Sequence, residues 1–346
     1  MQERKINIEF ARVIATVLVI SIHVANVYIR GFGRVPNGDF LVAVVFSSIA
    51  RICVPLFFMI SGMFSAGGNY DRKKYLGRVT RFIVVLAVWS VIYYFTKNGF
   101  AFEGLWKVVA NSFFNADKTS RHLWYMYPLI SIFIALPFIQ AICKNITREQ
   151  ENLFMALWFI LSGFSSVYLS LGKILSGQSV ALSYPVPLIN SAYYVGYFII
   201  GHIIAKRLEN TEFDKKRNLL CAGAYSTVTL AIILVTYIVS IKKGRLFEGM
   251  TYYRSAPVII AAVAVFLLIL CNSGKFKNAN ILRLSKHSFG IYLSHMIFLN
   301  IIKHYINITD FNAIIAIPVI TVLVFVCSAV FCALLSKIKF LRNILF

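Results

Sequence analysis

Apolar runs follow one another along nearly the whole chain, with short polar segments between them. Each run approaches the roughly 20 residues that a helix needs to cross a bilayer. The runs lie near residues 8–30, 40–64, 79–97, 122–143, 152–171, 188–205, 218–241, 254–272, 286–305 and 312–336. This pattern predicts an all-α, polytopic membrane helix bundle with about ten transmembrane helices in a single domain, residues 1–346. Glycines and prolines between residues 163 and 187 interrupt the pattern, and a re-entrant segment there would change the count.

The composition supports a membrane protein, and the distribution of charge predicts on which side of the membrane the termini lie. Of the 346 residues, 59% are hydrophobic and 14% charged, against about 25% charged in soluble domains. The net charge of +22 is scattered among the loops, so the sequence predicts contact with the lipid bilayer and an anionic ligand, not nucleic acid. With the N-terminus inside, inner segments hold about 21 Lys and Arg and outer segments about 12, which predicts that both termini are cytoplasmic.

The six cysteines lie mostly inside or at the ends of apolar runs, and no Cys-x-x-Cys pair occurs. Isolated thiols in such positions are typical of packing residues. The sequence therefore predicts neither a disulfide framework nor a metal site.

The first apolar run contains RVIATVLVISIH, which places Arg12 and His23 eleven residues apart. On a helix, eleven residues make three turns plus about 20°, so both side chains share one face, about 16 Å apart along the axis. Glu9 lies three residues before Arg12 and is expected to pair with it. Ionisable groups inside a membrane usually mark a functional site, and an imidazole suits general-base work. The alternative is a polar stripe that only packs against polar neighbours.

The second apolar run carries Arg51 near its middle, at about the depth of His23. There the guanidinium charge would act on that imidazole. Alternatively, Arg51 binds helix carbonyls that Pro55 leaves free.

Five short motifs follow one another in order along the chain. They are Arg12-x10-His23, VPLFFMISG at 54–62, RVTR at 78–81, HLWY at 122–125 and SFGIYLSH at 288–295. Together, and in this order, they resemble the acyltransferase-3 family of bacterial membrane proteins over about residues 6–305. Members acylate, most often acetylate, surface polysaccharides and related glycans. Glu9 departs from the family pattern, which usually has aspartate at that position.

The resemblance implies an acyl-CoA donor, with acetyl-CoA as co-substrate, made in the cytoplasm. The acceptor would be a hydroxyl of a cell-envelope glycan or lipid-linked sugar at a bacterial plasma membrane. Arg78 and Arg81, together with Arg12, are expected to bind the CoA phosphates through paired charge-assisted hydrogen bonds. The choice among acetyl, succinyl and longer acyl groups, the acceptor and the oligomeric state stay open.

The expected catalytic set is His23, Arg12 and Glu9, with His23 removing the proton of the acceptor hydroxyl and an acyl-histidine as the alternative. The expected pocket residues are Arg51, Ser61, His122, Trp124, Tyr125, Tyr292 and His295. Within this set, the HLWY side chains are expected against an acceptor sugar, or else in the aromatic belt of the membrane interface. Tyr292 and His295 would shape the pocket, unless His295 is a satisfied interhelical hydrogen bonder.

Two other functions compete with acyl transfer. A transporter or flippase for a lipid-linked saccharide would also need many helices and an internal polar cavity, and inverted repeats would favour it. No convincing similarity between the two halves of the sequence is visible. A non-catalytic scaffold would leave cell-surface chemistry unchanged when His23 is replaced.

Overall fold

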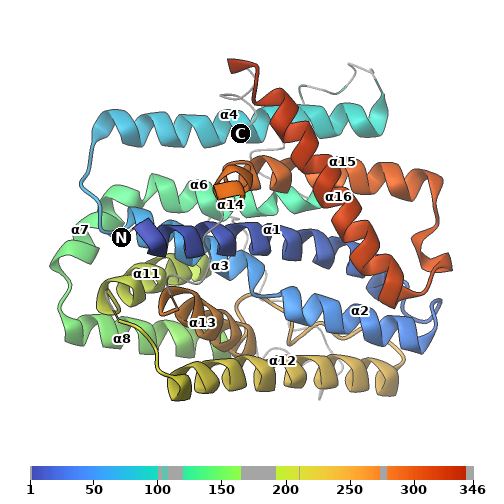
Figure 1. The fold of residues 1–346 in the computed structure, drawn as a ribbon, viewed down its shortest axis with the longest axis horizontal. Helices are drawn as coiled ribbons and strands as arrows, with labels where there is room; N and C mark the ends of the chain where they lie inside the picture. Colours follow the sequence, from blue (N-terminus) through green and yellow to red (C-terminus); the bar gives the residue numbers. More distant parts are fainter. Residues whose placement is uncertain are drawn as a thin grey trace.

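A computed structural model describes residues 2–99, 104, 106, 120–164, 192–209, 211–272 and 279–339, and every regular element in these residues is a helix (Figure 1). Each of the predicted apolar runs contains at least one helix. The elements are α1 (Gln2–Arg30), α2 (Asn37–Ala50), α3 (Cys53–Ser65), α4 (Arg72–Asn98), η2 (Arg121–Tyr125), α6 (Met126–Ile134), α7 (Leu136–Asn145), α8 (Arg148–Phe159), η3 (Ile160–Phe164), α11 (Ala192–Arg207), α12 (Lys215–Lys243), α13 (Ala256–Leu270), α14 (Ala279–Ser285), α15 (Ser288–Tyr305), η4 (Ile308–Asp310) and α16 (Ala313–Leu335).

Fewer helices than predicted are long and apolar enough to cross a membrane. In the described residues there are 5 such spans, formed by most of α1, by α2 and α3 together, and by α4, α12 and α16. A sixth is added if η2, α6 and α7 count as one span, bent by 59°. The prediction of ten spans is thus not confirmed. Most of the interrupted region between residues 163 and 187 lies outside the described residues, and the cytoplasmic position of the termini stays a prediction.

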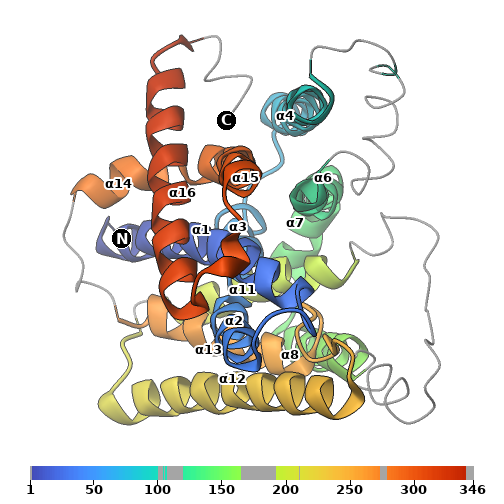
Figure 2. The same ribbon diagram turned by 90° about the vertical axis from the view of Figure 1, so that its right-hand side faces the viewer.

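The helices form a bundle around α1 and α3. In Figure 1, α1 runs through the middle, with α4 and α6 on one side and α2 and α12 on the other, and Figure 2 shows the same order. Burial follows this arrangement: 56% of the apolar window of α1 and 61% of that of α2–α3 are buried, against 17% in α12. The outer helices therefore present their apolar faces to lipid.

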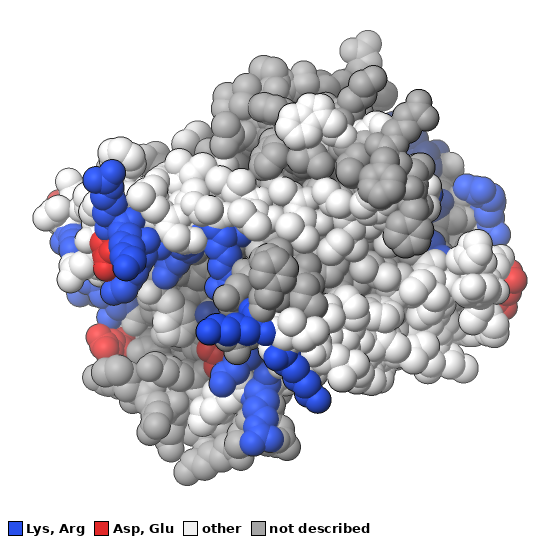
Figure 3. Space-filling view, turned by 90° about the horizontal axis from the view of Figure 1, so that it is seen from above, with Lys and Arg blue, Asp and Glu red and all other residues white. Residues whose placement is uncertain are grey.

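The surface has the charge distribution of a membrane protein. Figure 3 shows Lys and Arg gathered toward the ends of the molecule, with a broad surface without charged side chains between them. Many large apolar side chains of α12 and α16 are exposed, among them Leu219, Leu230, Ile315 and Leu323, as expected of helices that face lipid. The chain is a membrane protein.

A proline explains why the second span is two helices. Pro55 has no N–H to donate to the carbonyl of Arg51, and its ring clashes with that carbonyl. The helix therefore breaks at Arg51 and Ile52, and regular bonding resumes where the Leu56 N–H donates to the Ile52 carbonyl at 3.0 Å. As a result α3 begins inside the span.

The backbones of α3 and α11 touch at two glycines. A Cβ on Gly62 would lie 1.7 Å from the Phe198 oxygen, and a Cβ on Gly201 would lie 2.2 Å from the Met59 oxygen. Small residues at a membrane helix interface allow this close approach. The contact fixes the position of α3, which carries part of the site described next.

Candidate functional site

A large cavity opens toward the end of the bundle where α1 and α4 begin. Its volume is about 590 Å³. We call it the cationic cavity, and it is lined by Glu9, Arg12, Phe57, Ser61, Arg81, Phe82, Tyr125, Leu129, Phe133, Leu282, Ser285, Lys286, Ser288, Phe289 and Tyr292. Most of its wall is aromatic or aliphatic, so it fits a ligand with a long apolar section and anionic groups.

The charged side chains of this cavity are unbalanced. Glu9 and Arg12 form the expected ion pair, with Arg12 Nη1 3.1 Å from Glu9 Oε1. Arg81 and Lys286 add two further cations to the wall. The described lining residues thus hold three cations and one carboxylate, a balance that favours an anionic ligand.

A second space, of about 380 Å³, adjoins the first and holds Arg78. We call it the polar cleft, and it is lined by Phe64, Ser65, Gly68, Asn69, Tyr70, Asp71, Lys74, Tyr75, Arg78, Leu136 and Gln140. Hydrogen bonds from the backbone and side chain of Lys74 hold the pKa of Asp71 below its ordinary value, so this carboxylate stays charged in the cleft.

The predicted arginine pair is divided between the two spaces. Arg81 lines the cationic cavity, whereas Arg78 lines the polar cleft. The Arg78 guanidinium lies over the ring of Phe133, 5.2 Å from its centroid, and Nη1 is 3.4 Å from the Ser65 hydroxyl. Because Phe133 belongs to the wall of the cationic cavity, Arg78 stands at the junction of the two spaces.

Three histidines from distant parts of the chain meet in the interior. His23 of α1 and His122 of η2 each lie 5.1 Å from the ring of His295 of α15, and 6.4 Å from each other. His122 and His295 are buried, while His23 is half-buried. We call these three residues the histidine cluster.

Hydrogen bonds occupy both ring nitrogens of His122. His122 Nε2 lies 3.3 Å from the Leu293 carbonyl, which can only accept, so this nitrogen carries the proton. His122 Nδ1 therefore accepts from the Ser120 hydroxyl, at 2.7 Å. His122 is thus held in one tautomer and has no nitrogen left for chemistry.

The other two rings keep free nitrogens. His295 Nδ1 donates to the Tyr292 carbonyl in its own helix, which leaves Nε2 unprotonated and buried, with no partner among the described residues. Among the described residues His295 thus forms no interhelical hydrogen bond, the alternative that the sequence left open. His23 forms no hydrogen bond within the part of the chain that the structure describes. The cluster therefore keeps lone pairs that can accept a proton.

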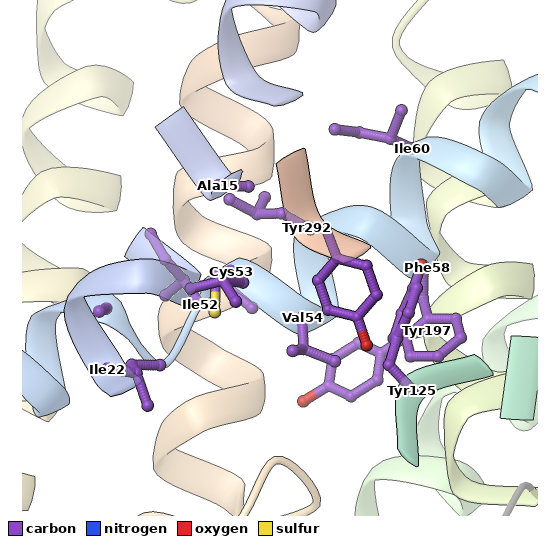
Figure 4. Close-up of a cluster of buried hydrophobic side chains, with 14 of the residues drawn as sticks. Ala15, Ile22, Ile52, Cys53, Val54, Phe58, Ile60, Tyr125, Tyr197 and Tyr292 are labelled. Carbon is purple, nitrogen blue, oxygen red and sulfur yellow. The ribbon is translucent and has the colours of Figure 1, made fainter. Parts of the chain in front are cut away.

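A layer of tyrosine rings separates the cluster from the cationic cavity. Tyr125 and Tyr292 line the cavity with their rings 5.4 Å apart, and no histidine is among the described lining residues. The Tyr292 hydroxyl donates to the carbonyl of His122, and its ring lies 5.9 Å from those of His122 and His295. Figure 4 shows both tyrosines among the buried apolar side chains.

The remaining predicted pocket residues are Ser61, Arg51 and Trp124. Ser61 lines the cationic cavity. Arg51 donates to the Ser47 hydroxyl at 3.1 Å and lies 5.7 Å from the centroid of Tyr253, so its described bond does not go to a freed carbonyl. Its charge is close enough to act on His23. Trp124 stacks on Tyr253 at 5.6 Å and makes an edge contact with its neighbour Tyr125, with ring centroids 6.4 Å apart.

One side of the cavity was not predicted from the sequence. Ser285, Lys286 and Ser288 join its wall from the junction of α14 and α15. The signal was the short polar stretch SKHS at 285–288, whose last residue begins the final motif. Phe57, Phe82 and Phe133 also line the cavity. They were not predicted because, in an apolar run, the sequence does not distinguish a phenylalanine that lines a cavity from one that faces lipid. The described residues contain no group of His, Cys, Asp or Glu that could hold a metal ion.

Comparison with known proteins identifies the family. No curated protein and no solved structure matches the chain. The model of the acyltransferase-3 family, described as an acyltransferase domain, matches residues 5–336. This match covers nearly the whole chain, including both helices that bring His23 and His295 together, and the protein therefore belongs to the acyltransferase-3 family of membrane acyltransferases.

Proposed function

We propose that the protein transfers a short acyl group, in the simplest case acetyl, from acyl-CoA to a hydroxyl of a cell-envelope glycan or lipid-linked sugar. The observation that carries this proposal is the juxtaposition of a positive, apolar-walled cavity with a histidine cluster that keeps unprotonated nitrogens. Binding groups for a large anionic donor and a base for the acceptor lie on two sides of one tyrosine layer. A transporter would not need this pairing.

The two adjoining spaces suit the two halves of acyl-CoA. The apolar wall of the cationic cavity accommodates the pantetheine arm, while Arg81, Lys286 and Arg12 bind the diphosphate. The polar cleft, with Lys74 and Arg78, accommodates the 3′-phosphate and the adenosine. Both spaces open at the end of the bundle that the sequence predicts to be cytoplasmic, where acyl-CoA is made.

His23 is the general base of the proposed reaction. It takes the proton of the acceptor hydroxyl while that oxygen attacks the acyl carbon, and the carbonyl electron pair moves onto oxygen. When the carbonyl reforms, the carbon–sulfur bond breaks and the thiolate of CoA takes the proton from His23. In the alternative, the acyl group is first transferred to His23 and then to the acceptor hydroxyl, and CoA leaves as the thiol in the first step. A burst of free thiol in the absence of acceptor would distinguish this route from direct transfer.

Thermal melting of the purified protein in detergent tests the donor assignment. Ligands that bind the folded state raise the melting temperature by mass action. Acetyl-CoA and CoA are expected to raise it saturably, and ADP less, because ADP lacks the pantetheine arm and the 3′-phosphate. The absence of any shift, with no release of free thiol when a glycan acceptor is added, would overturn the proposal in favour of saccharide transport.

A further inference from the structure

The segment that carries His122 also carries Tyr125, and its conformation aligns the two side chains. Residues Arg121–Tyr125 form a 3-10 helix. In this helix, residues three apart lie above one another, separated by about 6 Å along the axis. His122 therefore belongs to the histidine cluster while Tyr125, one turn further on, lines the cationic cavity.

The ring of Tyr125 is firmly held. It is 7% exposed and lies 4.8 Å from the ring of Phe58 and 5.4 Å from that of Tyr292 (Figure 4). These contacts come from α3 and α15, so the ring is fixed from two sides. The position of its hydroxyl is therefore set before any ligand binds.

The hydroxyl itself has no hydrogen-bond partner among the described residues. Buried tyrosines usually have one, and others in this chain do. The Tyr93 hydroxyl donates to the Leu293 carbonyl at 2.7 Å, the Tyr28 hydroxyl donates to the Ile308 carbonyl at 2.7 Å, and those of Tyr197 and Tyr292 also donate to carbonyls. Of these five tyrosines, Tyr125 is the one whose hydroxyl has no partner among the described residues, and it lines the cationic cavity.

The surroundings indicate which ligand atom accepts this bond. Tyr125 lies against Tyr292, which contacts His122 and His295, whereas the cations proposed to bind the phosphates come from α1, α4 and the α14–α15 junction. Arg12 lines the same cavity as Tyr125 and adds a positive charge to its wall. A prepositioned hydrogen-bond donor at the reacting carbonyl is the arrangement that stabilises a developing oxyanion.

We propose that the Tyr125 hydroxyl donates a hydrogen bond to the acyl carbonyl oxygen of the donor and stabilises its negative charge in the transition state. This inference rests on the proposed acyl-CoA function. The phenol keeps its proton throughout: the acceptor oxygen adds to the carbon, the charge on the carbonyl oxygen is held by Tyr125, and its collapse expels the thiolate. Tyr125 is thus a catalytic residue on the donor side, not part of an acceptor-sugar platform.

Replacing Tyr125 with phenylalanine tests the proposal, because only the hydroxyl is lost. Release of free thiol from acetyl-CoA in the presence of a glycan acceptor should fall by about 10²-fold or more in kcat. Affinity for free CoA, which has no acyl carbonyl, should not change. The matched control is Tyr197→Phe, which removes a buried hydroxyl bonded to the Tyr253 carbonyl outside the cavity and should leave turnover unchanged.

A thioether analogue supplies a second readout that does not need turnover. S-ethyl-CoA lacks the carbonyl oxygen, so the wild-type protein should bind acetyl-CoA more tightly, and Tyr125→Phe should remove this preference. Wild-type kcat in Tyr125→Phe, or an equal loss of CoA affinity and kcat, would overturn the inference alone. Wild-type protein that releases no thiol from acetyl-CoA would overturn the proposed function and this inference with it.

Discussion

The cationic cavity and the histidine cluster lie next to each other but are built differently. The cavity has long, partly exposed Arg and Lys side chains on an apolar wall, and these side chains can change conformation to reach the anionic groups of a ligand. In the cluster, His122 and His295 are buried and oriented by hydrogen bonds to main-chain carbonyls. Binding a large flexible donor needs adaptable charges, whereas proton transfer needs fixed geometry. The comparison suggests that affinity and chemistry can be altered separately.

Removing the base should produce the largest effect. His23→Ala is expected to lower the rate of acyl transfer by about 10²- to 10⁴-fold, the contribution that general-base catalysis usually makes. Affinity for acetyl-CoA should stay close to that of the wild type, because His23 does not line the cationic cavity. Thiol release and calorimetric titration measure the two quantities.

The matched control for this variant is His304→Ala, which removes an exposed histidine from the last turn of α15. It should change neither quantity. Retained turnover in folded His23→Ala would remove His23 from the chemical role and point to His295.

Removing a cation of the cavity should weaken donor binding and leave the rate of the chemical step unchanged. Arg81→Ala is expected to weaken binding of CoA by about 10- to 100-fold, since a hydrogen bond to a charged group contributes about 1.5–3 kcal/mol. At saturating acetyl-CoA, kcat should stay near the wild-type value. Arg72→Ala, at the exposed start of the same helix, is the control. Unchanged affinity in Arg81→Ala would contradict the phosphate assignment.

A smaller and more selective effect is expected in the polar cleft. Wild-type protein should bind CoA more tightly than dephospho-CoA, which lacks the 3′-phosphate, by about tenfold. Arg78→Ala should remove most of this preference while Arg78→Lys keeps part of it, because lysine retains the charge but not the paired donors. An undiminished preference in Arg78→Ala would place the 3′-phosphate elsewhere.

A change outside both regions should affect stability alone. Glu151 of α8 is buried and pairs with Lys206 at 3.2 Å and Arg207 at 2.7 Å. Burial acts to raise its pKa, but the hydrogen bonds from Arg207 and Lys206 outweigh burial and hold it below its ordinary value. Glu151→Gln is therefore expected to reduce stability by about 1–3 kcal/mol at pH 7, without changing CoA affinity.

The pH dependence of this stability has a definite sign. A lowered pKa means that the contribution of Glu151 is complete above the unfolded value of about 4.3 and is lost as the pH falls through the lower folded value. The difference in melting temperature between wild type and Glu151→Gln should thus shrink only at acid pH. Exposed Glu149, in the same turn, should give no such difference when changed to Gln.

Hydropathy predicted where the helices are, but not where they break. Every apolar run contains a helix, because burial in lipid or protein requires the backbone to bond within itself. The breaks at Arg51 and at Ala135 fall inside apolar runs, so the average hydropathy does not change there. Pro55 and Pro137 were visible in the sequence, yet many membrane helices accommodate a proline without ending.

The site could be predicted where it depends on local spacing. The pair Glu9 and Arg12 follows from a separation of three residues on one helix. The meeting of His23 with His122 and His295 depends on the packing of three separate segments, which no local pattern determines. Likewise, Trp124 and Tyr125 are adjacent in sequence, but Trp124 packs on Tyr253 whereas Tyr125 lines the cationic cavity.

The glycine contact between α3 and α11 limits how the protein can move. With the Gly62 and Gly201 positions in backbone contact, neither helix can roll or slide past the other without a steric collision. The two helices therefore move as one rigid body, and Phe57 and Ser61 form a stationary wall of the cationic cavity. If acyl-CoA is the donor, we expect its entry to displace α4 or the α14–α15 junction, which also line the cavity.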